Sequence, residues 1–193
     1  PFFAQIARGV EDAAYENEYN IFLINSNEEP QRERAALDSL WEKDIDGIIL
    51  CSSRLPGQEL EAQVQRFPAM VVLNRDSLNP YPNLIKVNVN DQRGAQLAIQ
   101  RFAAMGRKQI AYIGGPAAST SNQRRLGGYR EHLRAAGLPV DSQLIEFEAP
   151  NTEGGRAAAA ALLARRPHMD AIFAFNDLVA VGAVQVCQEA GKR

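Results

Sequence analysis

The sequence predicts an α/β protein made of two similar, doubly wound lobes, each built on a parallel sheet. Three observations support this prediction. Short apolar runs typical of buried strands alternate along the chain with segments of helical periodicity. The alternation starts again with a new strand near residue 107. Polar residues directly follow several of the predicted strands, the position where open parallel sheets bind ligands.

The first half of the chain begins with a predicted helix. Apolar residues recur at helical spacing from Phe2 to Ala14, and Pro1 suits the first turn. Asp91 is a good N-cap for a later helix, which Gly106 ends. The pattern predicts strands at 20–24, 48–51, 69–73 and 85–89, and further helices at 30–41, 57–66 and 91–105.

The second half repeats the alternation. It predicts strands at 109–113, 144–147 and 171–175, and helices at 122–136, 152–165 and from Asp177 to Gly191, with Asp177 as the cap of the last helix. From the count of strand–helix units, we expect an N-terminal lobe at 1–107 and a C-terminal lobe at 108–193.

Composition indicates a globular protein. It argues against nucleic-acid binding by this segment alone and against a membrane-spanning segment. The 193 residues are 46% hydrophobic and 23% charged, with a net charge of −2. No apolar run approaches the ~20 residues of a membrane span. Cys51 and Cys187 have no disulfide framework spacing, and as isolated buried thiols they suit a reducing compartment, so we expect a cytoplasmic protein.

Polar side chains after the strands are the candidate ligand residues. Asn176 follows the strand at 171–175 and is the strongest candidate. Asn74 and Arg75 follow another strand and offer amide and guanidinium groups to hydroxyls or a carboxylate. The alternative for these two is a turn held by a salt bridge from Arg75 to Asp76. Further pairs, Asn25-Ser26 and Ser52-Ser53, follow other apolar runs.

The sequence offers no catalytic, metal or cofactor site. Gly114-Gly115-Pro116 lacks the third glycine and the later acid of a dinucleotide fingerprint. His132 and His168 have no metal-ligand companions, and no serine stands in a catalytic triad motif. We therefore expect no enzyme activity, no cofactor and no metal.

Several stretches, in order along nearly the whole chain, resemble the effector-binding core of the lactose-repressor (LacI/GalR-type) family of bacterial transcription regulators. The matching stretches are Pro1–Ala4, Asp46–Ile49, Asn74–Asp76, Asp91 with Gly94-Ala95, Met105–Gly115, Arg125–Tyr129 and Asp170–Asp177.

The resemblance implies a periplasmic-binding-protein-like fold of type I, with a small effector held in a cleft between the lobes. It also implies a homodimer and a helix-turn-helix domain that binds operator DNA. The chain would then be partial, since it lacks that domain, the strand that normally precedes Pro1 and the end of the C-terminal lobe.

The resemblance also assigns site residues. It places Phe2 and Phe3 at the cleft, with core packing as the alternative. It assigns an effector contact to Arg125 and keeps Asp177, the predicted cap, near the cleft. It also matches Ser119 and Ser121 to loop positions that can add hydroxyl contacts, for which turn and cap roles are equally open. Two departures bear on the ligand: Asn74 replaces a frequent acid, which makes an acidic effector easier to host, and Pro150-Asn151 lacks a frequent aromatic.

The leading functional prediction is therefore an allosteric sensor of a sugar or sugar-like metabolite that regulates transcription. The alternative is a periplasmic sugar-binding protein of an ABC transporter, which shares the fold. The residues upstream of Pro1 would discriminate the two, as a helix-turn-helix or a signal peptide.

Overall fold

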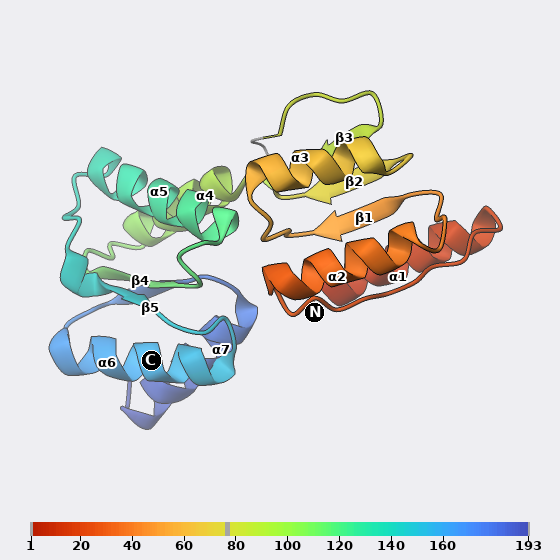
Figure 1. Cartoon of the computed structure of the whole chain (residues 1–193). Coiled ribbons are helices and arrows are strands. Elements are labelled where there is room, and N and C mark those ends of the chain that lie inside the picture. The colour runs from red at the N-terminus through yellow and green to blue at the C-terminus, as the bar shows by residue number, and fades with distance from the viewer. Residues whose placement is uncertain (1, 76–77, 193) are drawn as a thin grey trace. The chain divides into compact units, whose positions relative to one another are not determined.

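The computed structural model describes residues 2–75 and 78–192, and its contacts divide the chain into two compact units at 1–88 and 89–193 (Figure 1). Each unit contains a three-stranded parallel sheet with helices packed on it. The predicted α/β class with parallel sheets is confirmed. Pro1 and Asp76, both named in the predictions above, lie outside the described residues.

The N-terminal unit has a sheet with strand order β1-β2-β3. Ile48 of β1 is level with Met70 of β2, and Met70 with Leu84 of β3. The elements of this unit are α1 (Phe2–Glu16), α2 (Pro30–Trp41), β1 (Ile48–Cys51), α3 (Gly57–Arg66), β2 (Met70–Leu73) and β3 (Leu84–Val87).

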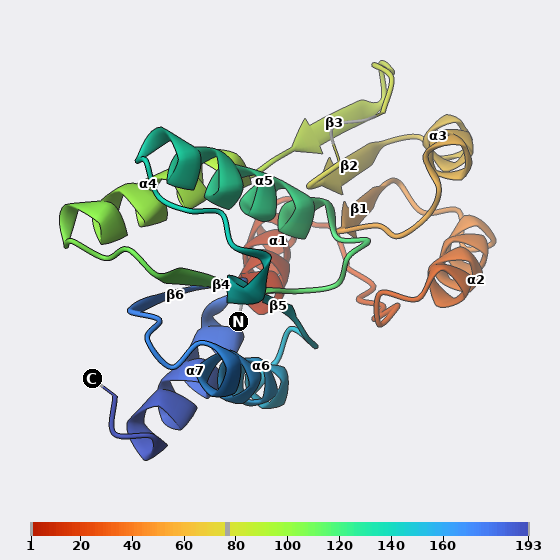
Figure 2. The same cartoon turned by 90° about the vertical axis from the view of Figure 1, so that its left-hand side faces the viewer.

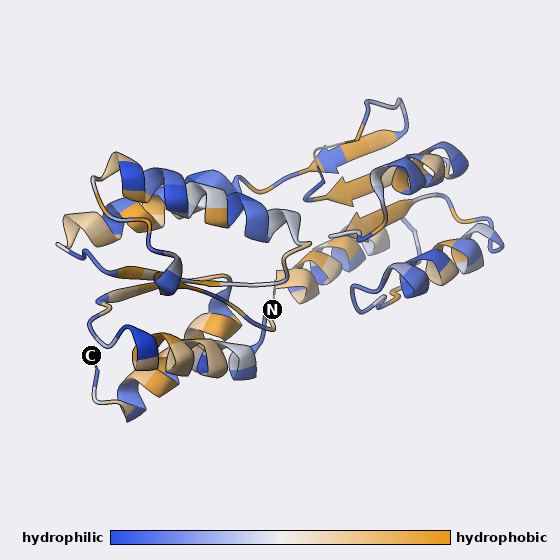
Figure 3. Cartoon of the chain, turned by 60° about the vertical axis from the view of Figure 1, so that its left-hand side comes forward, coloured by the Kyte–Doolittle hydropathy of each residue, from blue (hydrophilic) through white to orange (hydrophobic). Residues whose placement is uncertain are grey.

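The core of the N-terminal unit lies between the sheet and helices α2 and α3. Strands β1 and β2 are coloured as hydrophobic, and helices α2 and α3 carry both hydrophilic and hydrophobic residues, as Figure 3 shows. Alternate strand residues point to this core because side chains along a strand alternate between its two faces. Its buried members include Leu37, Ile48, Leu60, Val64, Met70 and Val72.

The predicted strand at 20–24 is wrong. The segment forms no regular secondary structure, and its apolar side chains are exposed, Leu23 to 79%. Among the described residues β1 pairs with β2 alone, so segment 20–24 has no neighbouring strand. A strand needs a backbone hydrogen-bonding partner, and an apolar pattern alone does not supply one.

The C-terminal unit has a sheet with strand order β5-β4-β6. Helices α4 and α5 cover one face of this sheet and α6 and α7 the other, as Figures 1 and 2 both show. The elements are α4 (Asp91–Ala104), β4 (Ile110–Gly114), α5 (Thr120–Ala135), the short 3-10 helix η1 (Ser142–Leu144), β5 (Ile145–Phe147), α6 (Thr152–Arg165), β6 (Ala171–Ala174) and α7 (Asp177–Glu189).

All of β4 is buried because it is the central strand with helices on both faces. Tyr112 points to the α4–α5 side, where it stacks on Tyr129 with ring centroids 5.3 Å apart. Ala111 and Ile113 point to the other side and pack with buried residues of α6 and α7. A run of apolar residues without alternation is what such a strand requires.

Helix α4 belongs to the C-terminal unit, so the contacts divide the chain before this helix and not at the predicted boundary of 107/108. It packs along α5, where a Cβ added at Gly128 would lie 2.8 Å from the Cβ of Ala95. Because most contacts of α4 are made with a later helix, the order of elements along the chain does not locate this boundary.

Both cysteines are free thiols, as expected, but Cys51 is exposed and only Cys187 is half-buried. Cys51 ends the edge strand β1, which explains why an apolar run there did not imply burial. Among the described residues no helix has the length and hydrophobicity to cross a membrane.

Two glycines let α6 and α7 approach each other closely. A Cβ at Gly182 of α7 would overlap the carbonyl oxygen of Thr152 and lie 2.8 Å from the backbone nitrogen of Arg156. Gly155 of α6 meets the backbone of Val179 in the same way. Because these neighbours are backbone atoms, they cannot turn aside as a side chain would.

Gly182→Ala should therefore destabilise the protein by about 1–3 kcal/mol, since it forces the two helices apart. Gly94→Ala is the matched control. Gly94 is also helical, but a Cβ there has no atom within 4 Å, so alanine should stabilise helix α4 by up to about 1 kcal/mol. Denaturant unfolding measures both, and equal effects of the two substitutions would contradict the close packing of α6 and α7.

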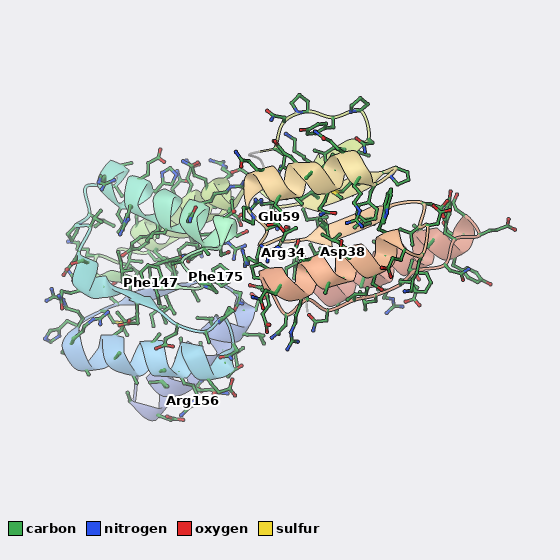
Figure 4. The ribbon with its side chains drawn as sticks, in the orientation of Figure 1. Arg34, Asp38, Glu59, Phe147, Arg156 and Phe175 are labelled. Atoms are coloured by element: carbon green, nitrogen blue, oxygen red, sulfur yellow. The ribbon has the colours of Figure 1, made fainter. Side chains whose placement is uncertain are left out.

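Ion pairs join α2 to α3 across the outside of the N-terminal unit (Figure 4). Arg34 donates two hydrogen bonds to the carboxylate of Glu59, and Arg66 pairs with Asp38 at 2.6 Å. The hydrogen bonds from Arg34 lower the pKa of Glu59 below its ordinary value of 4.5. Arg66 also lies 4.9 Å from the ring centroid of Trp41.

The lowered pKa of Glu59 predicts how stability depends on pH. A carboxyl group with a lower pKa in the folded state stabilises folding above its unfolded pKa, and this contribution is lost as pH falls through the folded pKa. Glu59→Gln should therefore lower the unfolding free energy at pH 7 and reduce its decline below about pH 4.5. Urea unfolding of the unmodified protein and of Glu59→Gln over this pH range measures both effects, and an equal decline in the two proteins would contradict the role of the Arg34–Glu59 pair.

Candidate functional site

The three strands of the C-terminal unit end side by side at one edge of the sheet, which we call the carboxyl edge. β5, β4 and β6 end there at Phe147, Gly114 and Ala174. Helices α5, α6 and α7 follow these strands and begin at this edge, and α4 joins them through a contact between Asp91 and Arg125. Helix N-termini carry free N–H groups and partial positive charge, which suit polar ligands.

Each of these helices is capped by the residue before it. Asn90 accepts a hydrogen bond from the backbone of Arg93, and Asn151 and Asn176 cap α6 and α7 at 2.8 and 2.9 Å. Ser119 caps α5 at 3.3 Å. The predicted cap roles of Asp91 and Asp177 are therefore wrong by one residue, since both are the first residues of their helices.

Arg125 of α5 joins three elements at the carboxyl edge. Its Nε and Nη2 atoms both contact one oxygen of Asp91, at 2.9 and 2.8 Å. Its Nη1 donates to the backbone carbonyl of Phe175, and its guanidinium lies 5.0 Å from the centroid of the Phe175 ring. These contacts fix the guanidinium plane, and the side chain is still 26% exposed.

Asn122 holds the loop that leads from β4 into α5. Its side-chain oxygen accepts hydrogen bonds from the Tyr112 hydroxyl at 2.8 Å and from the backbone of Gly115 at 3.0 Å. Burial raises the pKa of Tyr112, and Arg125 lowers it while Asp91 raises it. Tyr112 therefore stays protonated and serves as a hydrogen-bond donor.

Two phenylalanine rings flank the end of β4. Phe147 is level with Gly114 in the sheet, and a Cβ at Gly114 would lie 2.5 Å from its ring. A Cβ at Gly115 would lie 2.8 Å from the ring of Phe175. Figure 4 labels both phenylalanines, which come from the ends of β5 and β6. Because only glycine leaves room for these rings, the glycine pair shapes an aromatic surface rather than a phosphate-binding loop.

Five of the predicted site residues lie at or beside the carboxyl edge: Ser119, Ser121, Arg125, Asn176 and Asp177. Asn176 caps α7 with its oxygen and donates from its nitrogen to the carbonyl of Pro150 at 3.0 Å, so both ends of its amide have structural partners. Ser119 is buried in its cap role, and Ser121 is half-buried in the first turn of α5. Arg125 and the exposed Asp177 are the charged residues of this set.

In the N-terminal unit, Asn74 and Arg75 follow β2. Asn74 is buried and adopts a left-handed backbone conformation with φ of 60°, which asparagine tolerates. Arg75 donates from Nη2 to the carbonyl of Leu55 at 2.9 Å. The salt bridge expected with Asp76 lies outside the described residues. Arg75 thus steadies the loop after β1.

Glu33 holds the same loop from α2. Its side chain is buried, and one carboxylate oxygen accepts a hydrogen bond from the backbone of Arg54 at 2.9 Å. Ser53 accepts another from the backbone of Leu55. The loop that follows β1 is therefore held by Glu33 of α2 and by Arg75 after β2. The sequence did not predict this role for Glu33, because a glutamate in a helix is most often exposed.

Phe2 and Phe3 lie in the first turn of α1, with exposed fractions of 49% and 45% and their rings edge to face at 5.2 Å. The alternative for both residues was core packing. This alternative is wrong, because no residue from Phe2 to Glu16 is buried. The ligand contacts expected of these rings, and the cleft expected to be shared by the two lobes, remain predictions.

Sequence reasoning missed four residues that organise the carboxyl edge: Asp91 as a partner of Arg125, Asn122, Phe147 and Phe175. Asp91 and Arg125 are 34 positions apart, and no local pattern connects them. The two phenylalanines end strands beside a Gly-Gly pair, and that juxtaposition was the available signal. His132 and His168 belong to no metal-ligating cluster among residues 2–75 and 78–192.

Comparison with known proteins supports the resemblance. The profile of the family "periplasmic binding proteins and sugar binding domain of LacI family" matches residues 1–193. The chain is 35% identical to the ribose operon repressor of Halalkalibacterium halodurans, over all of this chain and 56% of that protein. The chain thus spans little more than half of that relative's length.

Solved structures give the same result. A complex titled transcriptional regulator CelR with cellobiose is 30% identical, with a TM-score of 0.86 over all of this chain and 59% of that one. A LacI family transcriptional regulator from Enterococcus faecium with bound ribose is 26% identical, with a TM-score of 0.83 over all of this chain and 69% of that one. These relatives are named as regulators or repressors, and none of the three is named as an enzyme.

The contacts of Asn176 predict a stability effect. Asn176→Ala removes the cap of α7, worth about 1 kcal/mol, and the hydrogen bond to Pro150, worth about 1 kcal/mol more. The neighbouring Asp177→Ala removes a charge at the helix N-terminus, worth about 0.3–1 kcal/mol. Denaturant unfolding of both variants should therefore rank Asn176→Ala as the more damaging, and the opposite order would assign the cap to Asp177.

Proposed function

Because the chain belongs to the family of periplasmic binding proteins and LacI-type sugar-binding domains, we propose that it is the effector-binding core of a transcriptional regulator. The effector is a sugar or a sugar-like metabolite, bound at the carboxyl edge of the C-terminal unit. The attached DNA-binding domains respond to it, in a homodimer that acts on operator DNA in the cytoplasm.

The observation that carries this proposal is the set of donors at the carboxyl edge. Arg125 presents a guanidinium held in one plane by Asp91 and by the backbone of Phe175. Three of the five guanidinium N–H groups are engaged in these contacts, which leaves two for a ligand. A pair of fixed donors suits the adjacent hydroxyl oxygens of a sugar.

The aromatic surface beside Arg125 supports the same class of ligand. Phe147 is 43% exposed at the end of β5, next to the glycine pair. The C–H face of a sugar ring is apolar, and aromatic side chains commonly form part of a small-molecule site. Together, Arg125 and the two rings offer a polar side and an apolar side to a ring with hydroxyl groups.

Regulation would follow from differential binding. An effector changes the affinity for DNA only if it binds the two conformations of the regulator unequally, and a coupling of ~1–3 kcal/mol is typical. The periplasmic sugar-binding alternative is not favoured, because the relatives above are named as transcription regulators and repressors.

The test is ligand binding by the full-length protein. A thermal-shift screen with ribose, cellobiose, galactose and glucose should find a sugar that raises the melting temperature, since a ligand of the folded form stabilises it by mass action. Addition of that sugar should change the affinity for operator DNA. A screen in which no sugar raises the melting temperature would contradict the proposed function.

Arg125→Lys tests the assigned site. Lysine keeps a positive charge opposite Asp91 but loses the planar pair of donors, so affinity for the identified sugar should fall about tenfold or more, which is ~1.4 kcal/mol. Arg166 is the matched control, since it belongs to another Arg–Asp pair in the same unit, with Asp141 at 2.5 Å. Arg166→Lys should leave the calorimetric affinity unchanged, and a similar loss in both variants would place the sugar elsewhere.

A further inference from the structure

We infer that Asp91 determines the charge of the ligand that the carboxyl edge accepts, by neutralising Arg125. In this role Asp91 is a positioning residue that acts through Arg125 and makes the site select uncharged ligands over carboxylates and phosphates. The inference rests on the proposed function and deepens it. It is also opposed to the sequence-based expectation that the site would host an acidic effector easily.

The geometry of the pair is the first support. The side chain of Asp91 is 1% exposed, whereas that of Arg125 is 26% exposed. The carboxylate therefore lies beneath the guanidinium, on its protein side, and the ligand meets only the arginine. A buried carboxylate is poorly screened by solvent, so it reduces the positive potential that Arg125 presents.

The second support is the way the donors are used. A carboxylate ligand is best bound by two parallel N–H groups of an arginine, one from each of two nitrogens. The Nε and Nη2 groups that form one such pair already contact a single oxygen of Asp91, at 2.9 and 2.8 Å. Nη1 is partly engaged by the Phe175 carbonyl. The protein's own acid thus occupies the Nε–Nη2 pair, and an anionic ligand must compete with this carboxylate for the charge of the guanidinium.

The third support is the second oxygen of Asp91. Among the described residues, Oδ2 accepts no hydrogen bond, although it is buried. Both contacts from Arg125 go to the other oxygen, Oδ1, and Arg125 is the cation paired with this carboxylate among the described residues. The exposed Asp177 at the start of α7 adds a further negative charge at the same edge. An anionic ligand at this edge would meet both negative charges.

A purely structural role for Asp91 makes a different prediction. If Asp91 only kept Arg125 in place, its substitution would lower the affinity for neutral ligands and for anionic ligands to the same degree. The ratio of the two affinities is therefore the informative quantity, and it does not depend on how much overall affinity is lost.

The experiment uses Asp91→Asn in the full-length protein. Asparagine keeps the shape and one oxygen acceptor but removes the charge. Calorimetry compares three matched pairs of ligands: glucose with glucuronate, galactose with galacturonate, and ribose with ribose 5-phosphate. We expect the unmodified protein to prefer the neutral member of the pair it binds. In Asp91→Asn the ratio of affinities should move at least tenfold toward the anionic member.

Asp141→Asn is the matched control, because it removes the acid of the Asp141–Arg166 pair in the same unit. Its ratio should equal that of the unmodified protein. An unchanged ratio in Asp91→Asn, with binding retained, would overturn the inference and leave the proposed function standing. Tighter binding of the anionic ligand by the unmodified protein would also overturn it, and this result needs no variant to fold. If no sugar binds at all, the proposed function fails and the inference fails with it.

Discussion

The contacts of Arg125 are the interaction on which the carboxyl edge depends. One guanidinium connects the first turn of α4, the body of α5 and the residue that follows β6. These segments come from distant parts of the sequence and meet because parallel strands end at the same edge of a sheet. The buried Asp91 carboxylate balances the charge of Arg125. The edge therefore has a guanidinium fixed in one orientation and little net charge.

The glycines of this unit serve the same edge in two different ways. Gly155 and Gly182 allow α6 and α7 to pack backbone against backbone, which brings the N-termini of both helices to the ends of β5 and β6. Gly114 and Gly115 instead leave space for aromatic rings at the end of β4. Glycine is therefore required at two kinds of position in this unit: where two helices pack closely, and where aromatic rings lie against the backbone.

Much of the fold could be predicted from the sequence because its signals are local. Helices α3 and α6 begin and end where the periodicity placed them, at Gly57–Arg66 and Thr152–Arg165. The strand prediction at 20–24 was wrong because a strand depends on a partner strand, which a local pattern does not reveal. For the site, the cap of α7 was assigned to Asp177 and is Asn176. The pairing of Arg125 with Asp91 is a long-range contact that a single sequence does not reveal.

The uncovered apolar segment at 20–24 and the outer edge of β1 have a practical consequence. Unpaired strand edges beside exposed hydrophobic side chains are templates for pairing between molecules. Concentrated solutions of these 193 residues alone would be prone to intermolecular β-pairing, even though the hydrophobic cores of both units are well formed. Crystallisation and spectroscopy of these 193 residues would benefit from low protein concentration or from a fused strand that pairs with the outer edge of β1.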